Sequence, residues 1–374
     1  MASGGPARTR VLVAGLGDTG VLAAGALARH RDLAVTGVSP TTGLVSGQEL
    51  GLRLRDPDAW SRDYRIAYRS FRRLDPVDVV HGRLVSADLD AREVTVEHTD
   101  GTTGTLGWDV LVVATGVANG FWRSDGLRDD AAVAADLAAR HAQVAAAATV
   151  AVVGGGAAAV SAAYNLAVRW PDKQVSLWFP GERALPQHHG RTWAGVRRRL
   201  EAAGVALHPG HRAVLPASDE PCPGPVRWST GQPDAPADLV VWAVGRVRPH
   251  TGWLPAEVLD EQGFVRTGRD LRVPGADRVF AIGDVAATDP LRSTARNFAH
   301  PVLVRNVRAH LAGEPLREVA LPARRWGSVL GPQRSGLEVF DKGGRAFRVP
   351  RAVVDRALQP LVVKRGIYGG VRRG

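Results

Sequence analysis

The sequence predicts an α/β fold built from two Rossmann-like, three-layer dinucleotide-binding domains and a small C-terminal α+β region. The first observation is the stretch VLVAGLGDTG at 11–20, an apolar strand that runs into a glycine loop. The second is its repeat, VAVVGGGAAA, at 150–159. Each copy opens a helix of small residues and is followed by another strand about 20 residues later, which is the context that a dinucleotide-binding loop requires. The length of 374 residues allows two or three domains of roughly 150 residues.

The elements of the first half follow in order. Apolar runs predict strands at 10–15 and 33–38, with a helix at 19–30 between them. The polar, aromatic-rich stretch from 47 to 75 is typical of helices with loops. Alternation with period two over 79–116 predicts a set of antiparallel strands that ends in a buried strand.

The second half repeats this plan. Helices are predicted at 131–147, 158–169 and 191–204, and strands at 149–153, 173–179, 205–214, 237–249 and 278–286, before a helix at 293–312. We therefore assign residues 1–118 and 246–313 to one dinucleotide-binding domain, 119–245 to a second, and 314–374 to the C-terminal region.

Composition limits the functional classes. Hydrophobic content of 45% and charged content of 23% are ordinary for a globular protein, and no apolar run is long enough to span a membrane. We expect a cytoplasmic protein, or one held peripherally on the inner face of a membrane. The single cysteine, Cys222, excludes an internal disulfide and a Cys-x-x-Cys redox pair. Almost all of the net charge of +11 comes from arginine, as a GC-rich coding bias would produce, so a nucleic-acid partner is not favoured.

Each position of the glycine loop has a physical task. The first residue allows a tight turn, the second lets the backbone approach a pyrophosphate, and the third keeps helix and strand close. In the two copies these residues are Gly15, Gly17 and Gly20, and Gly154, Gly156 and Ala159. Two such sites on one chain favour two dinucleotides that meet end to end, a flavin and a nicotinamide, with a hydride passing between their rings.

Three further motifs strengthen this interpretation: ATG at 114–116, WAVGRVRP at 242–249 and VFAIGDVA at 279–286. With the two loops, they resemble the two-dinucleotide-binding flavoprotein superfamily over roughly residues 10 to 312. Within it, the chain is most similar to the branch of apoptosis-inducing factor, which includes the ferroptosis suppressor protein and the type II NADH:quinone dehydrogenases.

The resemblance implies particular site residues. The helix that begins near Ser293 and Thr294 would point its N-terminus at the flavin. Gly154, Gly156, Ala159 and Gly245 would hold NADPH or NADH. FAD would be bound by Gly15, Gly17, Thr19, Gly20, Leu84, Thr115, Gly116, Gly283 and Asp284, the last through the ribityl chain.

Three positions depart from the family pattern. Ser39 stands where an acidic residue usually binds the adenosine ribose of FAD. Asp18 lies inside the first glycine loop, where we favour a helix cap over a group that repels the phosphates. Phe179 replaces the acid of NADH-selective proteins, and Arg183 follows shortly after, which together favour NADPH.

Few residues suggest acid–base chemistry. Arg296 and His300 lie on the helix that should face the flavin, so they are the candidates for tuning the ring or touching substrate. His188 and His189 have no metal-like spacing to other ligands, and we interpret them as surface histidines before a helix. No metal site is expected.

The leading hypothesis is an FAD-dependent NAD(P)H oxidoreductase that passes electrons to a small acceptor such as a quinone. A soluble reductase or tailoring oxidoreductase, serving a partner protein or a biosynthetic pathway, is the alternative. A hypothesis from another functional class is a nucleic-acid-binding or signalling flavoprotein, in which the dinucleotide-binding folds serve as a scaffold. The basic tail from Val349 to Gly374 suits either a membrane surface or packing on the FAD domain, and a homodimer stays open.

Overall fold

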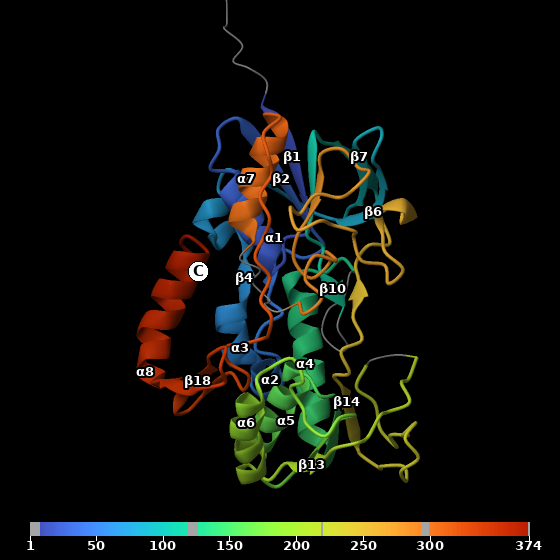
Figure 1. The fold of residues 1–374 in the computed structure, drawn as a ribbon, viewed down its shortest axis with the longest axis vertical. Coiled ribbons are helices and arrows are strands. Elements are labelled where there is room, and N and C mark those ends of the chain that lie inside the picture. The colour runs from blue at the N-terminus through green and yellow to red at the C-terminus, as the bar shows by residue number, and fades with distance from the viewer. Residues whose placement is uncertain (1–7, 119–125, 218–219, 293–298, 373–374) are drawn as a thin grey trace, which may run out of the picture.

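The computed structural model describes residues 8–118, 126–217, 220–292 and 299–372. Two parallel sheets lie at opposite ends of the long axis (Figure 1). The first has the order β16-β9-β1-β2-β5, in which every neighbouring pair is parallel. Its strands are β1 (Thr9–Ala14), β2 (Leu33–Ser39), β5 (Asp78–His81), β9 (Val110–Val113) and β16 (Val279–Ala281).

Alternation along β1 explains the layers around this sheet. Val11 and Val13 pack into the core formed with helices α1 (Asp18–Leu27) and α7 (His300–Leu311). Leu12 and Ala14 point to the other face, where the core includes residues of the antiparallel strands β6 to β8. These strands are β6 (Arg83–Asp88), β7 (Glu93–Glu97) and β8 (Thr103–Gly107).

One predicted strand pairing is wrong. Residues 79–81 were expected among the antiparallel strands, but they form β5, which pairs in parallel with β2 through Val38↔Val80 and Ser39↔His81. Apolar residues with β propensity mark a strand without specifying its partner, and the partner here lies 40 residues earlier in the chain.

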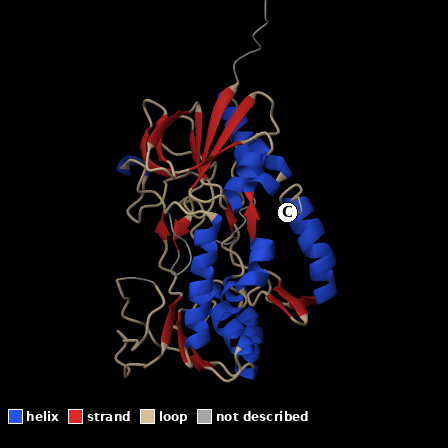
Figure 2. Cartoon of the chain, turned by 180° about the vertical axis from the view of Figure 1, so that it is seen from behind, coloured by secondary structure: helices blue, strands red, loops and turns tan. Residues whose placement is uncertain are grey.

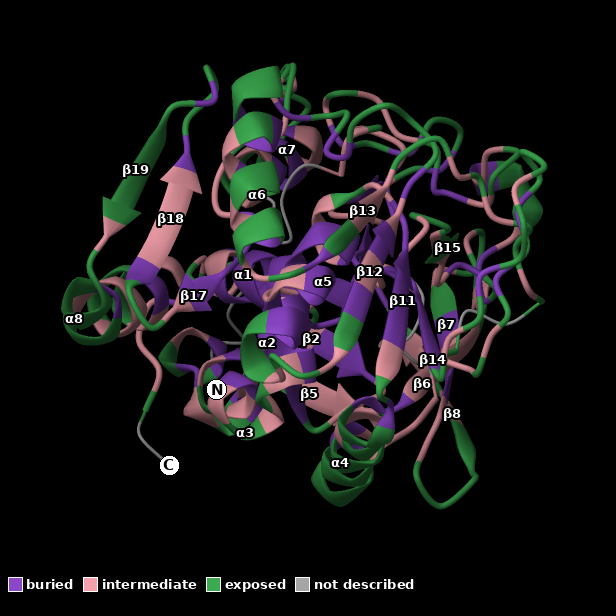
Figure 3. Cartoon of the chain, turned by 90° about the horizontal axis from the view of Figure 1, so that it is seen from below, coloured by how far each residue is buried: buried purple, intermediate pink, exposed green. Residues whose placement is uncertain are grey.

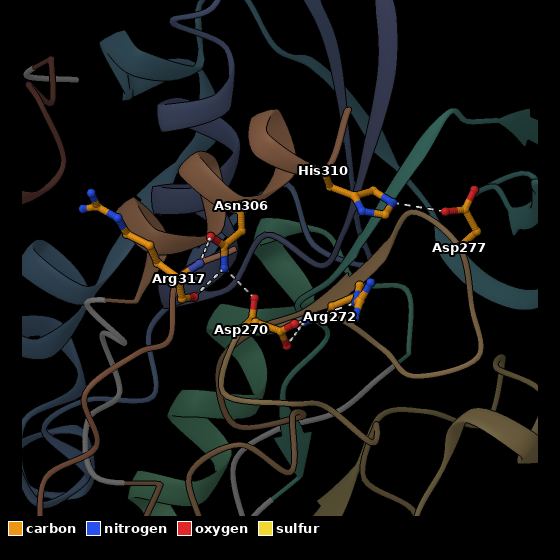
Figure 4. A network of polar contacts seen from close by, with 6 residues as sticks. All are labelled: Asp270, Arg272, Asp277, Asn306, His310 and Arg317. Atoms are coloured by element: carbon orange, nitrogen blue, oxygen red, sulfur yellow. Dashed lines mark hydrogen bonds and ion pairs between the residues drawn. The ribbon is translucent and has the colours of Figure 1, made fainter. Parts of the chain in front are cut away.

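Helix α7 is fastened to the segment that precedes β16 (Figure 4). The fully buried Asn306 donates through Nδ2 to the carbonyl oxygens of Asp270 (2.7 Å) and Arg317 (2.8 Å). The ring of His310 lies 3.1 Å from the carboxylate of Asp277. The described part of α7 begins at His300, and the predicted helix start at 293–294 lies outside the described residues.

The second sheet has the order β13-β12-β11-β14, again with parallel neighbours. Its strands are β11 (Thr149–Val153), β12 (Gln174–Trp178), β13 (Ala206–His208) and β14 (Leu239–Trp242). Helices α4 (Asp130–Ala146), α5 (Ala157–Arg169) and α6 (Gly190–Ala202) pack on one face through Val150 and Val152. The other face is covered by loop residues such as Val226 and Trp228. The crossings between the halves, β10 (Val117–Ala118) and β15 (Arg248–Pro249), pair with each other in an antiparallel manner.

A helical insertion joins the two halves, and Figure 3 shows its helix α2 (Leu50–Arg55) beside α5. Gly51 permits the contact, because a Cβ there would lie 2.4 Å from Ser161 Oγ. The insertion also contains β3 (Gly43–Val45), α3 (Pro57–Tyr64), β4 (Arg65–Ala67) and the short turns η1 (Tyr68–Ser70) and η2 (Arg72–Leu74). A further turn, η3 (Ala256–Val258), precedes β16.

The C-terminal region packs against both halves, with Leu330 and Phe340 in the core of the second half and Tyr368 in the core of the first. The contact of Tyr368 supports packing on the first half for the basic tail. The C-terminal region forms β17 (Pro332–Gln333), β18 (Gly336–Phe340) and β19 (Ala346–Val349), then α8 (Arg351–Val353) and the wide helix η4 (Val354–Ile367). Figure 2 shows this last helix standing apart from the two sheets. Its end returns to the core through Val363 and Tyr368, both buried.

Two basic residues of the tail are in ion pairs within the protein. Lys364 Nζ lies 2.8 Å from Asp63, and Arg372 is in a 2.6 Å ion pair with Asp75. The apolar residues Leu361 and Val362 are exposed. Among the described residues, no helix is long and apolar enough to cross a membrane.

We predict that the tail is part of the folded core. Tyr368 is 2% exposed, and its ring meets Phe71 edge-on at 5.2 Å. Tyr368→Ala should lower the free energy of unfolding by about 3 kcal/mol, because it leaves a cavity. Val362→Ala, at a position 51% exposed, should change it by less than about 0.5 kcal/mol. Denaturant unfolding of both variants checks this, and equal stabilities would mean that the tail does not pack as described.

Candidate dinucleotide sites

The first glycine loop forms an open cradle at the carboxyl end of β1. Gly15 has φ +97°, and a Cβ there would lie 2.7 Å from the carbonyl oxygen of Ala114. A Cβ on Gly20 would lie 1.9 Å from the carbonyl oxygen of Gly15, so helix and loop touch. A Cβ on Gly17 would have no neighbour within 4 Å. The open space lies at Gly17, the position where a pyrophosphate should approach the backbone.

Two adjoining cavities extend this cradle along the edge of the first sheet. The first, of about 140 Å³, lies over the glycine loop. The second, of about 550 Å³, is lined by Leu84 on β6 and shares Gly15, Pro40, Thr115 and His250 with the first. The cavity over the loop brings together most of the residues expected to bind FAD, namely Gly15, Gly17, Thr19, Ser39, Thr115, Gly116, Gly283 and Asp284.

Asp18 is not the helix cap that the sequence favoured. Gly17 occupies the cap position and makes no side-chain cap bond. The buried carboxylate of Asp18 instead accepts hydrogen bonds from Ser46 Oγ (2.7 Å), the Gly47 backbone N–H (2.9 Å) and Gln48 Nε2 (3.1 Å). These donors compensate its charge, so Asp18 holds the 46–48 loop against the first dinucleotide loop.

Ser39 lines the cavity, but its hydroxyl is already engaged. It lies 2.8 Å from the hydroxyl of Tyr68, which donates to the carbonyl oxygen of Leu16 at 3.0 Å. Burial raises the pKa of Tyr68 to about 12, so the phenol stays protonated. Tyr68 thus lies next to Ser39, where the family has an acid, and no pattern in the sequence predicts this contact.

Residues 115–116 are fixed to the returning strand. Thr115 Oγ1 donates to the carbonyl oxygen of His250 at 2.8 Å, and the His250 backbone N–H donates to the carbonyl oxygen of Gly116 at 3.0 Å. Both crossings between the halves are therefore tied together at the edge of the first cavity.

The second glycine loop repeats the geometry of the first. Gly154 has φ +144°, and a Cβ there would lie 2.1 Å from the carbonyl oxygen of Ala243, while Gly156 faces open space. Ala159 is fully buried, which keeps α5 close to the sheet. A cavity of about 270 Å³ lies over this loop, and Gly156 and Gly245 are in its lining.

The end of β12 shows why Phe179 cannot act on a ribose. Its ring is buried against Trp193, with the ring centroids 5.6 Å apart. Arg183 is exposed, and its guanidinium lies 3.5 Å from the carbonyl oxygens of Pro186 and His188. It does not line the 270 Å³ cavity described above.

A fourth cavity, of about 300 Å³, joins the two cradles. It shares Val117 and Asp284 with the cavity over the first loop. With the cavity over the second loop it shares Ala157, Ala158 and His188, among others. The four cavities therefore form one run from Leu84 to Gly245, and Asp284 lies at the junction.

His188 was predicted to be a surface residue, and this is wrong. It is 6% exposed and lines the two cavities on the side of the second glycine loop. Burial, and then the charges of Arg325 and Arg183, lower its pKa to about 4, so the ring is neutral near pH 7. Its neighbour His189 caps α6 by accepting from the Arg191 backbone N–H at 3.2 Å.

The catalytic candidates from the sequence are not brought to the cavities by the described structure. Thr294 and Arg296 lie outside the described residues. His300 begins α7 and is absent from the lining of the four cavities. The sequence missed His188 and Arg325, because burial of a polar residue in a loop leaves no periodic pattern.

This fold and its two facing glycine loops define a flavoprotein-type oxidoreductase with two dinucleotide sites. Residues 9–302 match the pyridine nucleotide-disulphide oxidoreductase family, and the chain belongs to it. The predicted superfamily and fold class are thereby confirmed. FAD and a nicotinamide dinucleotide are the cofactors of this class of enzyme.

Individual relatives are distant. The oxidoreductase ptaL of Pestalotiopsis fici is 27% identical over 219 residues, which is 58% of each chain, so the match spans little more than half of that relative. The sulfide:quinone oxidoreductase of Aquifex aeolicus is similar in structure, with a TM-score of 0.68, 14% identity, and coverage of 97% of this chain and 92% of that one. An engineered water-forming NADPH oxidase derived from the Lactobacillus brevis NADH oxidase is also similar in structure, with a TM-score of 0.61 and 19% identity. The match covers 83% of this chain and 70% of that one. At these identities the structural likeness shows the fold.

The low pKa of His188 predicts a pH-dependent stability. Because the unfolded ring binds its proton near pH 6.5 and the folded ring near pH 4, the folded state loses stability as the pH falls between these values. From about pH 7 to about pH 4.5, wild type should lose about 2–3 kcal/mol more than His188→Phe. Denaturant unfolding at both pH values measures the difference. Parallel losses in the two proteins would show that the folded ring titrates normally.

Proposed function

We propose that this chain is an FAD-dependent oxidoreductase that takes a hydride from NAD(P)H and passes electrons to a small acceptor. The observation that carries the proposal is the row of adjoining cavities between the two glycine loops. A flavin in the first cradle and a nicotinamide in the second would meet where Asp284 and Val117 line both sides.

The chain's own groups fit these cofactors. FAD supplies the hydride acceptor when it is bound. The N-termini of α1 and α5 each present free backbone N–H groups and a partial positive charge to a pyrophosphate at Gly17 and Gly156. Asp284 lines the cavity at the junction, and its carboxylate would accept hydrogen bonds from the ribityl hydroxyls.

The proposed coenzyme is NADPH in preference to NADH. With Phe179 buried in the core, the end of β12 offers no carboxylate at that position to repel a 2′-phosphate. Arg183 is exposed nearby and free of carboxylate partners among the described residues. The engineered NADPH oxidase supports this reasoning, since its changes from the NADH oxidase include aspartate to alanine and two gains of arginine.

The proposed acceptor is a quinone. The lining of the junction cavity is mixed: beside charged residues it has an apolar part from Leu50, Val117 and Val329. This part and the exposed Trp326 suit a flat aromatic acceptor. Cys222 is the one cysteine in the sequence, so no pair is present to relay electrons to a disulfide. The likeness to a sulfide:quinone oxidoreductase also supports this acceptor.

The packing of the C-terminal tail gives some support to a reductase that works away from a membrane. With Lys364 and Arg372 in ion pairs, lipid contact would depend on the exposed Leu361 and Val362. A reductase that works away from a membrane, for a partner protein or a biosynthetic pathway, is therefore the second candidate.

The hydride transfer is tested by flavin absorbance under anaerobic conditions. Wild type should purify with flavin that bleaches with NADPH at lower concentration than with NADH. Gly17→Val should lose FAD, because the side chain fills the open space at the first loop. Gly156→Val should keep FAD and lose bleaching by NADPH, while dithionite still reduces it. Each variant is the control for the other, and a wild type that takes up no FAD would contradict the proposal.

The acceptor is tested by oxidation of the bleached enzyme. A short-chain ubiquinone in anaerobic buffer should reoxidise the flavin at least about ten times faster than buffer that contains oxygen and no quinone. Trp326→Ala should slow reoxidation by the quinone without changing the rate of bleaching. Reoxidation only by oxygen or by an added protein partner would replace the quinone with the second candidate.

A further inference from the structure

The C-terminal region supplies a half-buried arginine to the cavities on the side of the second glycine loop. Arg325 lines both the 270 Å³ and the 300 Å³ cavity. Its backbone N–H donates to the Gln187 carbonyl oxygen (3.0 Å), and its guanidinium donates to the carbonyl oxygens of Leu291 (2.9 Å, from Nε) and Arg292 (2.6 Å, from Nη2). These bonds fix the side chain, and Nη1 has no hydrogen bond to any residue that the structure describes.

His188 faces the same two cavities, and its ring makes no hydrogen bond to the described residues. It is 94% buried, since 6% of its surface is exposed, and Nδ1 has no hydrogen-bond partner among the described residues. No side-chain bond from Nε2 to the described part of the chain is present either. Leaving such groups unpaired in the interior costs free energy, so a ligand that pairs with them gains it.

Both side chains lie where a phosphate is already favoured. The 270 Å³ cavity also contains Gly156, Ala157 and Ala158, the N-terminal end of the 13-residue helix α5. A helix N-terminus, a fixed guanidinium and an imidazole N–H in one cavity are donors that suit a diphosphate. Asp284 and Asp289 act on the charge of Arg325 without a hydrogen bond to it. A carboxylate ligand would use fewer of the donors in the cavity, and a neutral ligand would gain less from the guanidinium.

We propose that Arg325 and His188 bind the diphosphate of the nicotinamide coenzyme, so that the C-terminal region forms one wall of the coenzyme site. This inference rests on the proposed function, because it assumes that the second loop binds NAD(P)H. Arg325 also bonds to the 187 and 291–292 segments, which come from the two different halves. By binding Arg325, the coenzyme would be linked to both halves as well as to the C-terminal region.

The test uses the FAD-loaded full chain and titrates ADP-ribose, which carries the diphosphate, and adenosine, which lacks it. Arg325→Gln should raise the Kd for ADP-ribose about tenfold or more, the effect expected from losing a hydrogen bond to a charged group. The Kd for adenosine should stay within about twofold. The matched control is Arg324→Gln, which changes an exposed neighbouring arginine and should leave both constants unchanged.

A second variant decides the matter if Arg325→Gln does not fold. His188→Phe keeps an aromatic ring and removes both nitrogens, and it should weaken ADP-ribose binding about fivefold or more with adenosine unaffected. Equal losses for both ligands, or unchanged binding of ADP-ribose in the folded variants, would overturn the inference. If the FAD-loaded wild type binds neither ADP-ribose nor NADPH, the proposed function itself fails, which is a distinguishable result.

Discussion

The antiparallel pairing of β10 with β15 is the contact on which the arrangement of the two halves depends. Each half is a parallel sheet whose glycine loop is positioned by its own strand and helix, so neither half specifies where the other lies. The paired crossings, reinforced by Thr115 and His250, bring the two carboxyl edges toward each other. Only then do the separate cavities become one run, and the chemistry requires two rings in contact.

A second level of organisation comes from polar residues buried between segments. Asp18 gathers three donors from the 46–48 loop and lies 3.4 Å from the hydroxyl of Tyr368 near the end of the chain. The 46–48 loop beside the first glycine loop and the C-terminal tail are thus held by one carboxylate. A charge in this place is tolerable only because its partners are supplied locally, which explains how a dinucleotide loop can contain an aspartate.

The sequence sufficed for the fold because repeated glycine loops and apolar strands are local patterns. The two loops, their helices and the strands that follow them were predicted within a few residues, and Gly17 and Gly156 face open space as their positions suggested. What could not be predicted depends on contacts distant in the chain. Tyr68 reaches Ser39 from a turn, and the parallel partner of β5 is not encoded in its own residues. His188 seemed to belong to the surface because its burial comes from loops and from the C-terminal region.

The close contact of Gly51 with α5 has a consequence for how ligands come and go. Asn165, buried on α5, donates to the Leu330 carbonyl oxygen and accepts from Arg55 and Gln333, so three parts of the chain are interlocked beside that contact. Rotation of one half against the other would have to drive α2 into α5 or break this cluster. The two halves therefore form a rigid unit with fixed openings to the cavities, and they do not open and close around a ligand as hinged domains do. Exchange of the nicotinamide would be governed by local rearrangement of loops at the rim, and each catalytic cycle would leave the interior packing intact.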